Sequence, residues 1–308
     1  FYEMISDVEL KYIESVEIKC LVAFIVYSYV WSVIGNNCSK VDQIWSITPV
    51  VYSWLLLVLH YLYEGNNFEI HYRLLLVCLL LATWGIRLTY NFWRKGGYGN
   101  LIIHEEDYRW PILRKMINNV WLFQLFNLTF IAIYQNVLLF LIAAPSYFVL
   151  QGPSSISIND VIIAVAFIGL FIMETVADEQ HFRFQTYKHS LSAEERAKSD
   201  DIDVKRGFYT SGLFAYCRHP NYFAEQSMWV CVYLFSITPK ESDFINWTII
   251  GPILLILLFQ GSMRFGESIS ASKYPLYKEY QRRIPQCIPS FAIIVSDLLG
   301  GKGSKKSS

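Results

Sequence analysis

Charged residues are scarce in this chain of 308 residues: 17% are Asp, Glu, Lys or Arg, whereas 54% are hydrophobic. That balance excludes an ordinary soluble domain of this length. The chain also lacks net charge, because its 26 basic and 26 acidic residues cancel, so no nucleic-acid partner is expected. Its six cysteines lie far apart without paired spacing, which argues against a disulfide framework and against a cysteine-rich zinc site.

Two other kinds of site are missing from the sequence. With six histidines in all, the chain has none of the repeated histidine boxes of a membrane di-iron enzyme, and no metal site is predicted. The glycine cluster at 96–99 permits a tight turn. It is not the dinucleotide fingerprint, because that motif needs a strand before it and a helix after it.

Long apolar runs dominate the rest of the chain. They lie at 20–35, 44–63, 73–93, 120–143, 158–177, 222–238 and 244–263. Most approach the roughly 20 residues that a helix needs to cross a bilayer, so the predicted fold is an all-α polytopic membrane bundle with about seven transmembrane helices. We expect a polar segment at 1–19, one integral membrane domain at 20–290 and a cytosolic tail at 291–308.

Basic residues alternate between the two sides of the bilayer as seven spans require. The segments on one side hold at most one Lys or Arg each; they are 64–72, 144–159 and 239–243. The segments on the other side hold five, seven and eight; they are 94–119, 178–221 and the tail from residue 264. Because basic segments remain in the cytosol, the C-terminus is predicted to be cytosolic and the N-terminus lumenal or external.

The stretch 212–225 concentrates polar side chains between a charged segment and an apolar run. It contains Arg218, His219, Asn221, Tyr222 and Glu225. The proline at 220 favours a helix that starts directly after it, and on this helix Asn221 and Glu225 share a face. A guanidinium beside the free N–H groups of a first helical turn suits an anion. The stretch is therefore interpreted either as a recognition site for an anionic ligand or as a membrane-interface anchor.

Polar residues within or beside the apolar runs are further candidates. Asp42 opens the second run and Arg87 lies in the third, where they form either a structural ion pair or part of a site. Glu174, Asp178 and His181 fall on one helical face at the end of the fifth run. They are interpreted either as a site or as a helix end that meets water.

Arg206 and the tyrosines of the tail also allow two interpretations, as a cofactor site or as a membrane-interface feature. Arg206 either holds a phosphate or lies at the lipid headgroups. In the tail, Tyr277 and Tyr280 share a helical face, which suits either an interfacial helix or a cover over a flat cofactor ring.

Five segments together resemble the DUF1295 family, which is placed with the steroid 5-alpha-reductase C-terminal-domain superfamily. They are VDQIWS at 41–46, WGIRL at 84–88, EDYRW at 106–110, ADEQ at 177–180 and RHPNY at 218–222. The resemblance extends over roughly residues 40–290. The last segment and the tyrosine-rich tail are also shared with sterol reductases and with isoprenylcysteine carboxyl methyltransferases.

The resemblance implies a membrane bundle with a cytosol-facing pocket for NADPH, whose hydride reduces an activated carbon–carbon double bond. Such an enzyme is an oxidoreductase that acts on CH–CH groups, similar to 3-oxo-5-alpha-steroid 4-dehydrogenases, with a lipophilic steroid-, sterol- or polyprenoid-type substrate. The chain has His181 and Gln185 where sterol reductases have a Lys and an Arg, so the choice between NADPH and NADH stays open.

The candidate residues of this enzyme fall into two groups. Glu174 is a cofactor-binding candidate because it lies on the face of Asp178, and the resemblance implies the others: Asp178, Gln180, Arg183, Arg206, Arg218, His219, Asn221, Tyr222, Glu225, Arg264, Glu267, Tyr274 and Tyr277. The catalytic candidates at the substrate end are Asp42 and Arg87, with Tyr90 or Tyr98 as the proton donor.

Two other functions remain alternatives. An S-adenosylmethionine-dependent methyltransferase of a lipid or isoprenylcysteine-type substrate would use the same pocket for the methionine carboxylate, and a lipid-binding protein would keep the fold without chemistry. The C-terminal Lys305 and Lys306 resemble the dilysine signal that coat proteins recognise, although such basic tails also arise by chance. The expected location is the endoplasmic reticulum membrane, with membrane lipids and a lipophilic small molecule as partners.

Overall fold

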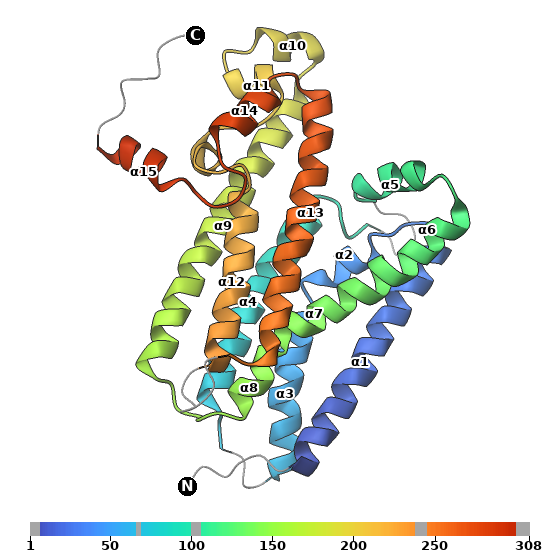
Figure 1. Ribbon diagram of the computed structural model, residues 1–308, viewed down its shortest axis with the longest axis vertical. Helices are drawn as coiled ribbons and strands as arrows, with labels where there is room; N and C mark the ends of the chain where they lie inside the picture. Colours follow the sequence, from blue (N-terminus) through green and yellow to red (C-terminus); the bar gives the residue numbers. More distant parts are fainter. Residues whose placement is uncertain (1–6, 66–68, 100–105, 238–244, 300–308) are drawn as a thin grey trace. The chain divides into compact units, whose positions relative to one another are not determined.

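The residues that the structure describes form helices joined by turns, and no strand occurs among them (Figure 1). This computed structural model describes residues 7–65, 69–99, 106–237 and 245–299. The all-α class predicted from the sequence is confirmed.

The chain divides into two compact units. Unit 1 comprises residues 1–168 and 229–256, and unit 2 comprises residues 169–228 and 257–308. Unit 1 contains α1 (Asp7–Ile34), α2 (Lys40–Trp45), α3 (Thr48–Glu64), α4 (Tyr72–Arg94), α5 (Arg109–Ile117), α6 (Val120–Phe126), the π-helix η2 (Asn127–Tyr134), α7 (Gln135–Ala143), α8 (Pro145–Leu150) and the 3-10 helix η4 (Trp247–Ile249). Unit 2 contains α10 (Ala193–Lys198), α11 (Ile202–Arg206), the 3-10 helix η3 (Gly212–Ala215), α14 (Tyr277–Arg283) and α15 (Phe291–Leu298). Three helices have residues in both units: α9 (Ile158–Ser190), α12 (Pro220–Ile237) and α13 (Ile250–Lys273).

Six helical stretches of the described part are long and apolar enough to cross a membrane. They are Val8–Ile34, Lys40–Glu64, Tyr72–Arg94, Val120–Leu150, Ile158–Ser190 and Trp247–Lys273. The remaining apolar run of the sequence, at 222–238, corresponds to α12, whose first turns carry Asn221, Glu225 and Gln226 and are therefore less apolar. By the length and composition of its helices, the chain is an integral membrane protein.

Helix α1 begins at Asp7, well before the apolar run at 20–35. Two of its acidic residues are turned inward, since Glu9 is 1% exposed and Glu17 is 6% exposed. Carboxylates on the buried face interrupt the apolar pattern without interrupting the helix. This explains why the sequence pattern places the start of the apolar run later than the start of the helix.

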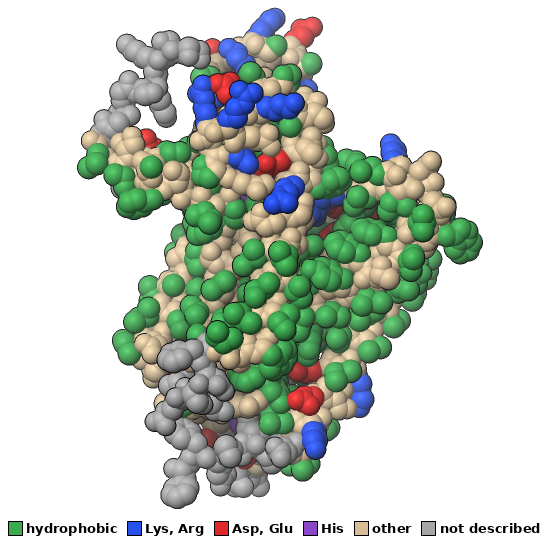
Figure 2. All heavy atoms as spheres, in the orientation of Figure 1, with side chains coloured by type: hydrophobic (Ala, Val, Ile, Leu, Met, Phe, Trp, Pro, Cys, Tyr) green, Lys and Arg blue, Asp and Glu red, His purple; other side chains and the backbone are tan. Residues whose placement is uncertain are grey.

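The core of unit 1 forms where α3 packs against α1, α4 and α7. Tyr52 of α3 lies edge-on between Phe24 and Phe140, with ring centroids 6.0 and 5.2 Å away. At the start of α3, a Cβ atom on Gly85 would lie 2.7 Å from the backbone oxygen of Ser46, so α4 approaches this turn in a way that only glycine allows. Hydrophobic side chains also cover the outer face over α6 and α7 (Figure 2).

The helix that follows Asn119 contains a π-helical segment, η2, between α6 and α7. On an α-helix, Asn127 and Asn136 would be about two and a half turns apart and on opposite faces. The wider π turns, with roughly one residue more per turn, bring both to the same face. There Asn127 donates to Ser32 Oγ at 2.8 Å and Asn136 donates to Ser28 Oγ at 3.0 Å, both on α1.

A buried ion pair ties α4 to the start of α9 in unit 1. Arg73 Nε donates to both carboxylate oxygens of Asp160, at 3.1 and 3.0 Å. The two side chains are 1% and 0% exposed. Arg73 Nη2 also donates to the Phe235 carbonyl at 2.8 Å, and Asp160 accepts from the Ser157 backbone N–H at 2.8 Å. The pair therefore joins several backbone segments at this end of unit 1.

The core of unit 2 is an aromatic cluster of Phe208, Tyr277 and Tyr280. The phenol of Tyr280 donates to the Phe214 carbonyl at 2.6 Å. Burial raises the pKa of Tyr280 above its ordinary value, so this phenol keeps its proton at neutral pH. The cluster joins α14 to the segment that precedes stretch 212–225.

Candidate functional site

The carboxylate of Glu267, on α13, is the centre of the polar contacts in unit 2. Arg218 binds it with two parallel bonds, Nε to Oε1 at 2.7 Å and Nη2 to Oε2 at 3.0 Å. His219 Nε2 lies 2.9 Å from Oε1, and Gln281 Nε2 donates to Oε2 at 2.8 Å. The side chains of Arg218 and Glu267 are 9% and 5% exposed, so this bidentate pair is shielded from water.

Arg218 also holds the segment after α14. Its Nη1 donates to the carbonyls of Gln281 and Ile284. Its backbone N–H donates to the Pro285 carbonyl at 2.9 Å, and the next N–H, of His219, donates to the carbonyl of Gln286 at 3.0 Å. Every nitrogen of the guanidinium is thus bonded within unit 2, and Arg218 positions the chain from 281 to 286.

Helix α12 begins at Pro220, one residue before the start that the sequence predicts. In its first turn, Asn221 Nδ2 donates to Asp178 Oδ1 of α9 at 3.3 Å. The ring of Tyr222 stacks on His219 at 5.5 Å and lies 4.8 Å from Phe259. The structure therefore brings candidates from three separate sequence motifs into one unit.

The polar face at the end of α9 is largely covered. Glu174 and Asp178 are 4% and 6% exposed, so the alternative of a helix end that meets water does not describe these two carboxylates. Gln180 accepts from the Leu213 N–H at 3.0 Å, and a Cβ atom on Gly212 would lie 2.5 Å from Gln180 Oε1. Gly212, at φ +60°, therefore lets the start of stretch 212–225 sit directly on α9.

The remaining candidates of unit 2 differ in exposure. Glu225 and Tyr277 are buried. The ring of Tyr274 packs against Gly207, where an added Cβ atom would lie 2.4 Å from the ring. Arg183 is exposed and pairs with Glu179 at 2.6 Å. Arg206 and Arg264 are exposed, and neither bonds to another residue that the structure describes. Lys and Arg side chains gather over α11 and α14 in Figure 2.

In unit 1, the candidates Asp42 and Tyr98 lie around the short helix α2. Trp110 Nε1 donates to Asp42 Oδ2 at 3.2 Å, and the charged neighbours of this carboxylate are Arg109 and Asp107. The phenol of Tyr98 donates to the Gln43 carbonyl at 2.6 Å, and burial raises its pKa above the ordinary value. Both side chains therefore form hydrogen bonds within unit 1.

The other two unit 1 candidates lie on α4. Arg87 is half-buried and Tyr90 is exposed. Tyr90 lines a groove of about 500 Å³ that runs between the start of α3 and the second half of α4. Its other lining side chains are mainly apolar and include Val50, Ile86 and Trp93.

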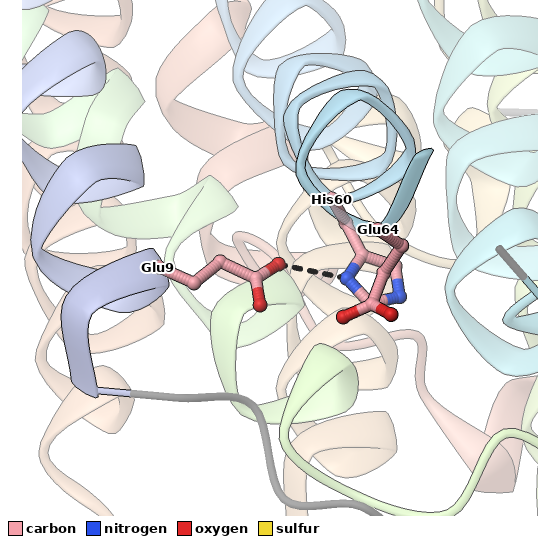
Figure 3. Close-up of side chains that lie close together, drawn as sticks. All are labelled: Glu9, His60 and Glu64. Carbon is pink, nitrogen blue, oxygen red and sulfur yellow. Dashed lines mark hydrogen bonds and ion pairs between the residues drawn. The ribbon is translucent and has the colours of Figure 1, made fainter. Parts of the chain in front are cut away.

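One further group has the spacing of metal ligands, and the sequence analysis missed it. Glu9 of α1 points toward His60 and Glu64 of α3 (Figure 3). Their ligand atoms lie within 4.8 Å of one another. Glu9 Oε1 and His60 Nδ1 form a hydrogen bond of 2.8 Å, so the group is also explained as an ion pair. The i, i+4 spacing of His60 and Glu64 was visible in the sequence, but Glu9, 51 residues from His60, was not.

Comparison with known proteins gives a consistent result. The family model described as "Protein of unknown function (DUF1295)" matches residues 28–284. The chain is 36% identical over 278 residues to a Schizosaccharomyces pombe protein named "Uncharacterized protein C594.04c", a match that covers 87% of this chain and 78% of that protein. No solved structure matches.

Proposed function

The chain belongs to the DUF1295 family, and we propose that it is a membrane-bound reductase that uses NAD(P)H to reduce an activated carbon–carbon double bond of a lipophilic substrate. The observation that carries this proposal is the meeting of Asp178, Asn221, Arg218, His219 and Glu267 in unit 2. These residues come from α9, α12, α13 and the turn that precedes α12, and from the motifs that the resemblance assigns to the cofactor.

The donor set of unit 2 fits a nucleotide, with one change to the roles expected from the sequence. Arg206 and Arg264 are exposed guanidiniums and suit the phosphates. Asn221 and the aromatic ring of Tyr222 suit a flat amide-bearing ring. Arg218 supports the site instead of contacting a phosphate, because its nitrogens are all bonded internally. The bound cofactor would supply the hydride.

On the substrate side, unit 1 offers the apolar groove lined by Tyr90. A phenol that polarises a substrate carbonyl needs an O–H that can reach the substrate. Tyr90 meets this requirement because it is exposed, whereas the O–H of Tyr98 is bonded to Gln43. We therefore assign the proton donor to Tyr90, and Asp42 and Tyr98 to the support of α2.

The test is nucleotide binding by the protein purified in a non-ionic detergent. NADPH should raise the melting temperature, because a ligand that binds the native state stabilises it. Arg206→Gln and Arg264→Gln should each weaken NADPH about tenfold through the loss of a charge-assisted bond. The matched control is Lys198→Gln, an exposed change on α10 that should leave affinity unchanged.

Titration of NADH and S-adenosylmethionine in parallel decides between the cofactors. Stabilisation by S-adenosylmethionine alone would replace the reductase with the methyltransferase. Binding of none of the three would remove the support for both enzymes and leave a lipid-binding protein.

We also propose that the C-terminus is cytosolic and that the protein resides in the endoplasmic reticulum. The support is the excess of Lys and Arg in 94–119, in 178–221 and in the tail. Lys305 and Lys306, the proposed coat-protein signal, lie outside the described residues.

An epitope tag placed after Ser308 should be removed by protease added to intact microsomes, while a lumenal marker protein stays protected. A tag that is degraded only after the membrane is opened with detergent would contradict the orientation.

A further inference from the structure

A cavity of about 200 Å³ lies in unit 1, away from the residues proposed for the reduction. Helices α1, α3, α7, α8 and η4 surround it. Its acidic and aromatic lining residues are Glu14, Glu17, Tyr52, Phe140, Tyr147 and Trp247. Among the lining residues that the structure describes, none is a Lys, an Arg or a His. The described walls of the cavity are therefore aromatic and acidic and supply no cation.

Two of these side chains are buried polar groups that lack a protein partner. Glu17 is 6% exposed and makes no hydrogen bond or ion pair with another described residue. Tyr52 is 2% exposed, and its hydroxyl has no hydrogen-bond partner within the described part of the chain. A buried carboxylate without a partner is costly, and it is relieved either by a proton or by a cation from outside the chain.

The second carboxylate lies at the exposed side of the cavity. Glu14 is exposed, and Tyr147 donates to its Oε1 at 2.8 Å. This bond fixes the carboxylate beside the aromatic side chains. The cavity is thus lined by one exposed carboxylate, Glu14, and one buried carboxylate, Glu17, and both attract a cation.

We propose that this cavity binds the ammonium group of an organic cation of the choline type. Aromatic faces attract a quaternary ammonium through their ring quadrupoles, and Tyr52, Phe140, Tyr147 and Trp247 supply such rings. The carboxylate of Glu17 supplies the counter-charge. A cavity of about 150 Å³ holds a molecule the size of benzene, so the space here accommodates a trimethylammonium group with its first carbons.

The cation has two sources, a free solute and the headgroup of a phospholipid. The cavity lies beside the start of α1, which the charge pattern places at the lumenal or external end of the span. Both sources present the same trimethylammonium group. The site is independent of the proposed reductase, because none of its residues is a candidate for cofactor or substrate binding.

The experiment uses the full chain in maltoside detergent and follows the melting temperature and calorimetric binding of choline. The control ligand is 3,3-dimethylbutan-1-ol, a neutral molecule of the same shape. Choline should bind, and the neutral alcohol should bind at least tenfold more weakly. Glu17→Gln should weaken choline at least tenfold, since it removes the charge and keeps the shape. Glu194→Gln, the same change at an exposed position of α10, should leave choline binding unchanged.

A second arm identifies the source of the cation. Dihexanoylphosphatidylcholine is titrated against dihexanoylphosphatidylglycerol, which lacks the ammonium. Binding of the choline lipid without free choline supports a headgroup site, and binding of both supports a site open to the solute. If wild type binds neither free choline nor the choline lipid, or if it binds choline and the neutral alcohol with the same measurable affinity, the cavity holds no cation and Glu17 is simply protonated. Full affinity in Glu17→Gln would overturn the proposal as well. Because choline and the neutral alcohol are compared on wild type, that comparison holds even where a variant fails to fold.

Discussion

Arg218→Ala is expected to lower the free energy of unfolding of unit 2 by about 3–5 kcal/mol, the usual cost of removing one partner of a buried ion pair. The change leaves the carboxylate of Glu267 buried beside His219 without its bidentate partner. It also leaves the carbonyls of Gln281 and Ile284 without the Nη1 donor. The loss should be measured by denaturant unfolding in detergent without any nucleotide, so that a loss of cofactor binding cannot produce it.

The matched control is Arg206→Ala, an exposed arginine of the same unit, which should change stability by no more than about 0.5 kcal/mol. A double change, Arg218→Met with Glu267→Leu, should recover part of the loss, because it removes the stranded carboxylate along with the guanidinium. Equal stability of Arg218→Ala and wild type would show that Arg218 does not position the chain from 281 to 286. It would return Arg218 to the role of a phosphate ligand.

Arg73→Met should destabilise unit 1 by a similar amount, about 3–5 kcal/mol. Asp160 is fully buried, so its carboxylate would be stranded, and the Phe235 carbonyl would lose its donor. The comparison is with Arg109→Met, which breaks an Arg–Asp pair whose side chains are 26% and 27% exposed. Such a partly hydrated pair contributes up to about 1 kcal/mol.

Both variants are to be unfolded under the same detergent conditions. Similar small losses for Arg73→Met and Arg109→Met would mean that water reaches the Arg73–Asp160 pair. A large loss confined to Arg73→Met would establish that burial, and not the Arg–Asp pairing itself, determines the cost.

The sequence predicted the helices well because the length of an apolar run and the position of a proline are local features of the chain. Pro220 does start a helix, and six of the seven apolar runs form stretches long enough to span a membrane. The sequence missed features that depend on packing. Segment 1–19 was predicted to be polar partly because of Glu9 and Glu17, since hydropathy cannot distinguish a buried carboxylate from an exposed one.

Prediction of the candidate site had the same limit. The i, i+4 spacing indicated that Glu174 and Asp178 share a face of one helix. The proline at 220 indicated that Asn221 lies in the first turn of a helix. The bond between Asn221 and Asp178 joins residues 43 apart, and the pairing of Arg218 with Glu267 joins residues 49 apart. Such pairings are determined by tertiary packing, for which spacing in the sequence gives no signal. Whether a guanidinium faces a ligand or the protein interior is therefore a structural question.

The wide π turn of η2 bears on how the protein is made. The span that contains it buries three amide side chains, those of Asn127, Gln135 and Asn136. An amide surrounded by lipid is costly, so this span is a poor candidate for inserting alone. Helix α1, which carries Ser28 and Ser32, emerges from the ribosome earlier. Because α1 precedes this span in the chain, the hydroxyl partners of Asn127 and Asn136 are already in place when the span enters the bilayer.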